Sequence, residues 1–193
     1  MSVLNTGLAT PATGFTIDQS LRFNDDDTPY LSKTPAGASN RKTWTWSAWV
    51  KVSALNAWQT LFAAGADSSN QTRLKLDDNS GGGHLFFDNE VSGSTNQRFM
   101  TSATFRDPSA WYHIVLAVDT TQGTDTNRVK IYVNGTQHTA FSITSYPAQD
   151  LEYWVNYTNA HYIGKEAGTG YFNGYMAEVH FIDGTALTPT SFG

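Results

Sequence analysis

The stretch Thr43–Val52, TWTWSAWVKV, decides the fold class of this chain. It consists largely of aromatic and β-branched residues, which favour strands over helices. Side chains alternate between the two faces of a strand, so Trp44 and Trp46 share one face while Trp49 lies on the other. A tryptophan on each face predicts a central strand that is covered on both sides.

Shorter segments of the same kind recur at intervals of about ten residues, separated by clusters of Gly, Asn and Asp. Strands are predicted at Leu21–Phe23, Trp58–Ala64, Arg73–Leu76, His84–Phe87, Trp111–Val118, Arg128–Val133, Tyr162–Ile163 and Tyr175–Ile182. Asn134-Gly135 is a two-residue hairpin signal, because both residues tolerate positive φ. One helical turn is predicted near the end, where Pro189 suits the first helical position. The pattern predicts an all-β chain of roughly twelve strands.

The length of 193 residues fits a single large β-sandwich domain. Residues 1–18 are small and polar, with Pro11 and Gly14 among them, and are expected to form an N-terminal arm or linker. Residues 19–193 are expected to form the domain. The sequence contains no cysteine, which excludes disulfides and thiolate metal sites.

The charge of the chain excludes several classes of partner. A net charge of −5 argues against binding to the phosphate backbone of a nucleic acid. No apolar run approaches the roughly 20 residues that a membrane-spanning helix needs. Residues 1–19 have neither the basic start nor the apolar block of a signal peptide. We therefore expect no nucleic acid, no membrane and no signal peptide.

Several blocks of sequence, in this order, carry a resemblance to a known family. They are Ser20–Phe23, Thr43–Val50, Trp111–Ile114, Ile131–Gly135, Tyr162–Gly164 and Phe172–Val179. On these blocks the chain resembles laminin G-like domains of the concanavalin A-like lectin and glucanase superfamily. The resemblance implies an antiparallel jelly-roll sandwich of two sheets, with binding sites on the connecting loops.

Two stretches carry a narrower resemblance. Arg41–Ser47 and Phe181–Pro189 are similar to domains of virion proteins from tailed phages. This similarity implies a place in a virion, on a tail fibre or capsid, or otherwise outside the cell. It also implies contacts with other virion proteins and with further copies of the same chain.

The glutamates argue against an enzyme. Glucanases of the superfamily carry strand-borne carboxylates at the spacing Glu-x-Asp-x-x-Glu, which places nucleophile and acid on one sheet face. The four glutamates of this chain are Glu90, Glu152, Glu166 and Glu178, and none is followed two residues later by Asp. The five histidines have no metal-site spacing such as HExxH. The sequence therefore predicts a binding or structural module without catalytic residues.

Calcium is the one cofactor that the resemblance suggests. In the related pentraxins an Asp-Asn loop and a Glu-rich stretch hold this ion, and the matching positions here are Asp67, Asn70 and Glu166. Ala167 and Gly168 stand where pentraxins supply further ligands. The resemblance therefore implies at most a weak, water-rich calcium site.

The segment Leu151–Asn159 is the richest candidate for carbohydrate binding. Aromatic faces flanked by amides are the usual parts of a glycan site, and Tyr153, Trp154, Asn156 and Tyr157 offer both. The alternative is that Trp154 closes the end of the sandwich. Two functions follow: recognition of a carbohydrate or cell surface, or a purely structural role as a decoration or fibre spacer protein with no small ligand.

Overall fold

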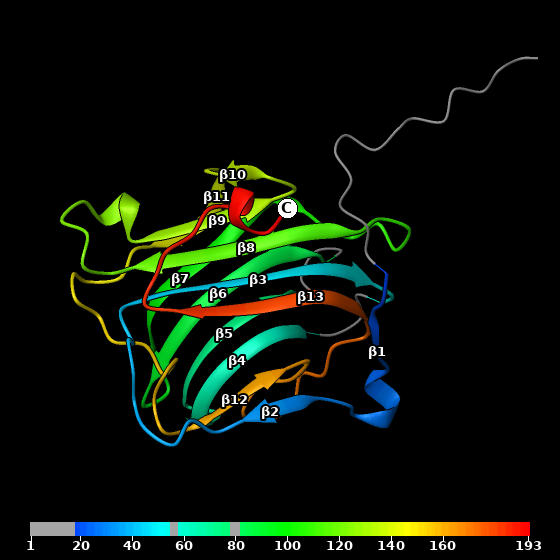
Figure 1. Cartoon of the computed structure of the whole chain (residues 1–193), viewed down its shortest axis with the longest axis horizontal. Helices are drawn as coiled ribbons and strands as arrows, with labels where there is room; N and C mark the ends of the chain where they lie inside the picture. Colours follow the sequence, from blue (N-terminus) through cyan, green and yellow to red (C-terminus); the bar gives the residue numbers. More distant parts are fainter. Residues whose placement is uncertain (1–17, 55–57, 78–81) are drawn as a thin grey trace, which may run out of the picture.

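The structure is a computed structural model that describes residues 18–54, 58–77 and 82–193. Apart from Asp18, the predicted N-terminal arm lies outside the described residues. The described chain folds into two antiparallel sheets packed face to face (Figure 1). The predicted two-sheet, all-β sandwich is confirmed.

Within the described residues, the first sheet has six strands in the order β1-β13-β3-β8-β9-β10. The bounds of these strands are β1 Leu21–Phe23, β13 Gly174–Asp183, β3 Thr43–Val52, β8 Tyr112–Asp119, β9 Val129–Val133 and β10 Thr136–His138. Strand β3 pairs with β13 on one side and with β8 on the other. The decisive stretch is therefore a central strand, as predicted.

The second sheet has seven strands, as far as the structure describes the chain, in the order β11-β7-β6-β5-β4-β12-β2. Their bounds are β11 Phe141–Ser145, β7 Ser94–Thr104, β6 His84–Val91, β5 Asn70–Leu76, β4 Gln59–Asp67, β12 Ala160–Ile163 and β2 Leu31–Lys33. The short strands β12 and β2 form one edge of this sheet. That edge borders the site described below.

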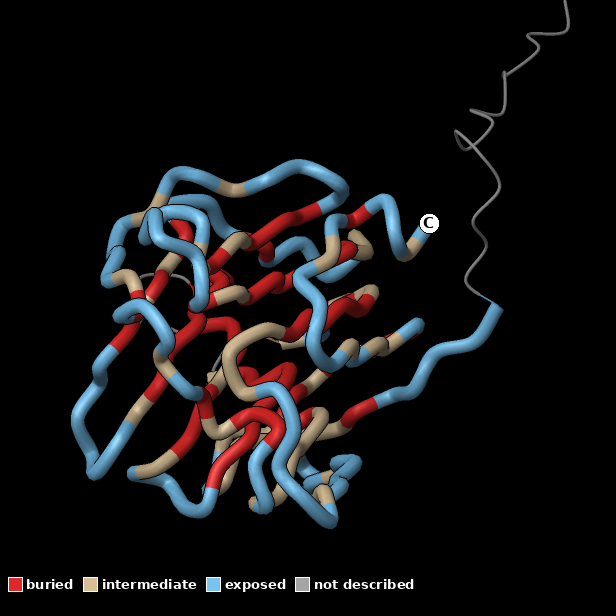
Figure 2. Tube along the Cα trace, turned by 60° about the vertical axis from the view of Figure 1, so that its left-hand side comes forward, coloured by how far each residue is buried: buried red, intermediate tan, exposed pale blue. Residues whose placement is uncertain are grey.

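The core lies between the sheets and is centred on the predicted face of β3. Trp44 and Trp46 are fully buried there, and Trp44 packs edge-to-face on Phe87 of the opposite sheet. Figure 2 shows the buried residues concentrated along the strands and the exposed ones in the loops. The other face of β3 is covered by the C-terminal segment, where the Leu187 amide donates to Thr45 Oγ1 at 2.8 Å. Both faces are therefore covered.

Local turn signals in the sequence are also confirmed. Asn134 and Gly135 have φ of 49° and 79° and join β9 to β10 as a hairpin. The predicted helical turn is a 3₁₀ turn at Pro189–Ser191. Among the described residues, two further 3₁₀ turns, at Asp25–Asp27 and Asp125–Asn127, were not predicted. None of the helices in the described part of the chain is long or apolar enough to cross a membrane.

Strand β13 contains an irregularity that changes which side chains face the core. A β-bulge lies between Ala177 and His180, and Glu178 within it adopts a φ of 47°, a region uncommon for residues other than glycine. An extra residue on one strand shifts the alternation of side chains by one position beyond the bulge. As a result, Phe181 and Asp183 face inward, toward the second sheet.

The same strand leaves one side of the sandwich open. Strand β1 pairs only with Gly174–Met176, the beginning of β13. In the described chain no strand pairs with the corresponding edge of β13 from Ala177 onward. A gap therefore remains between the end of β13 in one sheet and the edge strands β12 and β2 in the other.

Candidate functional site

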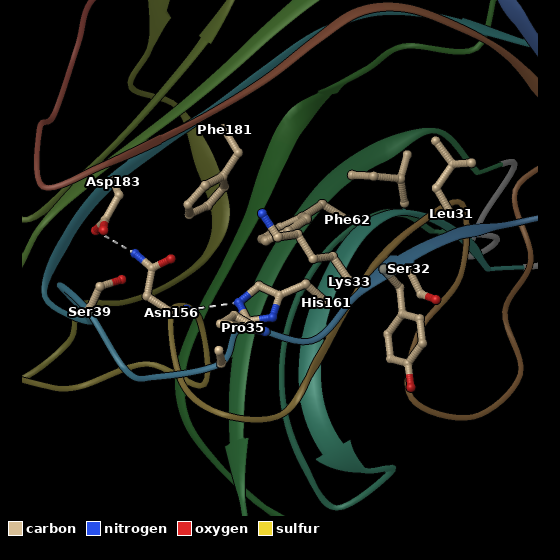
Figure 3. Close-up of a pocket in the computed structure, with 13 residues that line it drawn as sticks. Leu31, Ser32, Lys33, Pro35, Ser39, Phe62, Asn156, His161, Phe181 and Asp183 are labelled. Atoms are coloured by element: carbon tan, nitrogen blue, oxygen red, sulfur yellow. Dashed lines mark hydrogen bonds between the residues drawn. The ribbon is translucent and has the colours of Figure 1, made fainter.

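A pocket occupies this open side of the sandwich. Its volume is about 690 Å³, which lies within the range of about 300–1,000 Å³ typical of small-ligand sites. Strands β2, β12 and β13 line it, together with the loop after β2 and the loop before β12. We call it the side pocket. Figure 3 shows that the side chains around it include both apolar and polar groups.

Two phenylalanines form the apolar wall of the side pocket. Phe62 is buried in the core and Phe181 packs against it with a centroid distance of 5.7 Å. Phe181 also stacks on Trp44 at 6.1 Å and keeps 36% of its surface exposed. The core thus supports one side of the Phe181 ring while part of the ring remains available to a ligand.

Asn156 organises the polar side of the pocket. The backbone of Asn156 has a φ of 59°. The side-chain Nδ2 donates to the Asn40 carbonyl at 2.7 Å and to Asp183 Oδ1 at 2.8 Å. The Ser39 amide donates to the Asn156 carbonyl at 2.9 Å. These bonds fix the carboxamide, whose oxygen accepts no hydrogen bond from the described part of the chain. In Figure 3 this oxygen points toward the interior of the pocket.

His161 on β12 accepts a hydrogen bond from the backbone amide of Asn156. Its Nε2 lies 2.8 Å from the Asn156 amide nitrogen, and its Nδ1 lies 3.0 Å from the Asn159 carbonyl oxygen. The amide N–H can only donate, so Nε2 accepts and the proton is on Nδ1. Burial lowers the pKa of His161 below its usual 6.5, and the positive charge of Lys33 lowers it further. The imidazole is therefore neutral near pH 7.

Two charged groups border the side pocket. Lys33 on β2 is exposed and makes no ion pair within the described chain. Asp183 on β13 accepts from Asn156 Nδ2 and from the Asn40 amide through the same oxygen, Oδ1. Its Oδ2 and the Lys33 ammonium therefore offer an acceptor and a donor to a ligand.

The geometry can be set beside known proteins. A family model described as the concanavalin A-like lectin/glucanases superfamily matches residues 25–191. The chain belongs to this superfamily. The match confirms the resemblance to laminin G-like domains, and it covers every described strand of the sandwich except β1. A comparison with curated protein sequences finds no match.

Several solved structures of the superfamily fold are similar to this chain. A heptameric SAP-like pentraxin from Limulus polyphemus has 17% identity and a TM-score of 0.61, covering 88% of this chain and 77% of the pentraxin. The CBM40 of a Ruminococcus gnavus sialidase, bound to α2,3-sialyllactose, has 14% identity and a TM-score of 0.55, covering 84% of this chain and 95% of the CBM40. Domain 4 of a Geobacillus stearothermophilus arabinanase, in complex with arabinotriose, has 19% identity and a TM-score of 0.56, covering 91% and 87% of the two chains. At these identities the similarity establishes the fold.

The four residues predicted as a glycan site differ in their burial and do not form one site. Tyr153 is fully buried and packs edge-to-face on Trp44, so its side chain is in the core and out of reach of a surface ligand. Trp154 is half-buried and its Nε1 donates to the Glu90 carbonyl at 2.9 Å. Tyr157 is 39% exposed. Of the four predicted residues, Asn156 is the one that lines the side pocket.

Sequence reasoning missed most of the side pocket. Lys33, His161, Phe181 and Asp183 were not predicted as a site, although each is of a type common in sugar-binding sites. They come from β2 near the start of the described chain and from β12 and β13 near its end, and the bulge in β13 determines the facing of Phe181 and Asp183. The sequence signal that led to part of this site was the amide-rich segment Leu151–Asn159, which contributes Asn156.

The residues predicted to bind calcium make contacts with other groups. Asp67 Oδ1 accepts from Asn70 Nδ2 at 3.0 Å, and Glu166 Oε2 pairs with Arg73 at 3.3 Å. Asp67 and Asn70 are thus in contact with each other, whereas Glu166 forms an ion pair with Arg73. Among residues 18–54, 58–77 and 82–193, no group of three or more acidic or histidine side chains is placed to hold a metal.

Calcium is therefore expected to change the stability of the protein little. We expect millimolar calcium to shift the melting temperature by less than about 2 °C, because a weakly bound ion adds little stabilising free energy. Differential scanning fluorimetry with calcium and with EDTA measures this shift. A rise of several degrees with calcium, lost in Asp67→Asn, would instead establish a site at this loop.

Proposed function

We propose that the chain is a non-enzymatic carbohydrate-binding module and that the side pocket holds the sugar. The observation that carries the proposal is the partly exposed Phe181 ring beside Asn156, Asp183 and Lys33 in one pocket. Aromatic faces pack on the C–H groups of sugar rings, and amide, carboxylate and ammonium groups bind the hydroxyls. The pocket combines these two kinds of contact.

The comparisons support the proposal at the level of fold. Two similar domains, the sialidase CBM40 and arabinanase domain 4, were solved with sialyllactose and with arabinotriose. Against a catalytic role, Asp183 is the one carboxylate among the described residues that lines the side pocket. Glycoside hydrolysis in most families requires a pair of carboxylates on either side of the scissile bond. The site is thus suited to binding and lacks the second carboxylate of a hydrolase.

We propose further that this binding attaches a virion to a cell surface. The support is the similarity of Arg41–Ser47 and Phe181–Pro189 to domains of tailed-phage virion proteins. Mass spectrometry of purified particles tests the location: peptides of this chain are expected in the particles. Their absence from intact particles, with the chain present elsewhere in the culture, would contradict a virion role.

Substitutions in the side pocket test the binding proposal. A glycan array first identifies a ligand, and titration calorimetry then gives its dissociation constant. We expect Phe181→Ala and Lys33→Ala each to weaken binding about five- to thirtyfold, because each removes a direct contact worth about 1–2 kcal/mol. Unchanged melting curves for Lys33→Ala, at an exposed position, show that the fold is intact.

Tyr157→Ala is the matched control for this experiment. Tyr157 is an exposed aromatic residue of the originally predicted loop, and Arg41 lies 4.4 Å from the centre of its ring. It does not line the side pocket, so its loss is expected to leave affinity within a factor of about two. Loss of binding in Tyr157→Ala, with Phe181→Ala unaffected, would move the glycan site to the loop.

A further inference from the structure

We propose that His161 is a positioning residue for the side pocket: its neutral imidazole holds Asn156 in the orientation that binds ligand, and protonation of the imidazole releases it. The proposal rests on the proposed function, because the ligand is the carbohydrate assigned to the same pocket. It predicts that affinity decreases under mildly acidic conditions.

The hydrogen bonds of His161 fix its protonation state. The Asn156 amide N–H donates to Nε2 across 2.8 Å, so Nε2 carries a lone pair. The Asn159 carbonyl lies 3.0 Å from Nδ1 and accepts its proton. Both ring nitrogens are thus used, one as an acceptor and one as a donor. A doubly protonated imidazolium has two donors and cannot keep the first of these bonds.

Protonation would place two N–H donors against each other at the Asn156 amide. The amide and Nε2 would have to move apart, and because this N–H belongs to the backbone of Asn156, its side chain would move with it. Its side chain holds Asp183 at 2.8 Å and the Asn40 carbonyl at 2.7 Å. Displacing Asn156 therefore disturbs two of the polar groups assigned to the ligand.

The charges around His161 come from two of the elements packed against it. The positive charge of Lys33 on the neighbouring strand β2 disfavours the imidazolium. Asp183 on β13 accepts a hydrogen bond from the side-chain Nδ2 of Asn156. Strand β4 contributes the uncharged ring of Phe62. Burial together with Lys33 lowers the pKa of His161 below 6.5, although the Asn159 carbonyl acts in the opposite direction. Protonation, and with it the loss of binding, therefore falls below pH 6.5.

Binding measured against pH tests the proposal in the full chain. For the glycan identified on the array, we expect wild-type affinity to fall as His161 protonates, by about tenfold at one pH unit below the midpoint of its titration. His161→Gln offers an oxygen near the position of Nε2 and does not titrate, so its affinity is expected to remain constant over the same pH range. His180→Gln is the matched control: His180 is a partly exposed histidine that lies 3.6 Å from Glu178 and does not line the pocket. It is expected to keep the wild-type pH dependence.

A second measurement does not need a ligand. Nitrogen-15 NMR of the imidazoles reports which ring nitrogen carries the proton, and we expect the Nδ1–H form for His161 at pH 7. Its titration is expected to shift the Asn156 amide resonance at the same midpoint. An Nε2–H form, or an Asn156 amide that does not respond, would overturn the positioning role.

The binding measurement and the NMR titration distinguish a failure of the glycan-binding proposal from a failure of the positioning role of His161. If a glycan binds the side pocket of the wild-type chain with the same affinity above and below the pH at which His161 titrates, the positioning role of His161 is refuted and the proposed function stands. If no glycan binds at any pH, the proposed function fails. The NMR titration then still decides whether His161 holds Asn156.

Discussion

Trp44→Ala is expected to lower the free energy of unfolding by about 3–5 kcal/mol, the range found when a large aromatic residue is removed from a core. Trp44 is fully buried, and its ring contacts Phe87 at 6.1 Å and Tyr153 at 5.7 Å between centroids. It also lies under Phe181 of the side pocket. The removal leaves a cavity between the two sheets that neighbouring side chains fill only in part. Equilibrium unfolding in urea measures the loss.

The control for this prediction is a substitution of an exposed apolar residue. Val91 at the end of β6 is 41% exposed, so Val91→Ala is expected to change the unfolding free energy by less than about 0.5 kcal/mol. A loss below about 1 kcal/mol in Trp44→Ala would contradict the position assigned to this residue at the centre of the core.

Arg73→Met is expected to have a similarly large effect, about 3–5 kcal/mol, because it removes the guanidinium that pairs directly with three largely buried carboxylates. Arg73 pairs with Asp88 and Glu90, each at 2.6 Å, and with Glu166 at 3.3 Å. The side chains of Arg73 and Asp88 are only 11% and 1% exposed, so solvent screens this pair little. Urea unfolding at pH 7.5 measures the effect.

The pH dependence of this variant gives an independent check. Burial raises the pKa of Glu166, and the nearby cations Lys75 and Arg73 act in the opposite direction. A raised pKa means that the folded chain holds the proton more tightly than the unfolded chain. The contribution of Glu166 to stability is therefore present at low pH and is lost as pH rises above 4.5 and through the folded pKa. Removing Arg73 strengthens this trend, so Arg73→Met should be less destabilised near pH 5 than at pH 7.5.

A surface ion pair is the control for Arg73. Lys42 pairs with Asp150 at 3.2 Å, but their side chains are 35% and 57% exposed. Lys42→Met is therefore expected to cost less than about 1 kcal/mol. Equal losses in Lys42→Met and Arg73→Met would contradict the buried character of the Arg73 cluster.

The features that the sequence predicted correctly depend on local patterns. The facing of Trp44 and Trp46 follows from strict alternation within one strand, and the Asn134-Gly135 hairpin follows from the φ preferences of two adjacent residues. Both are properties of a few consecutive residues. The two-sheet arrangement was implied by the resemblance to laminin G-like domains, so the fold class could be predicted with no knowledge of the pairing order.

The side pocket could not be predicted in this way. A regular strand starting at Gly174 would turn Phe181 to the outer face, and the bulge at Glu178 reverses this facing without an evident sequence signal. Burial within one loop could not be predicted either: Tyr153 is fully buried, whereas Tyr157, four residues later, is 39% exposed. Likewise, the resemblance to pentraxins supplied Glu166 as a ligand but not the Arg73 that holds it. These outcomes depend on contacts between distant segments.

The most direct test of the central claim is to map a bound glycan onto the chain. Backbone amide NMR spectra of the labelled protein, recorded while the glycan is added, locate the contact surface. We expect the largest shifts at Lys33, Asn156 and Phe181, with Tyr157 and the Asp67 loop little affected. Shifts that concentrate on the Trp154–Tyr157 loop or on the outer face of either sheet, with the side pocket unchanged, would contradict the account.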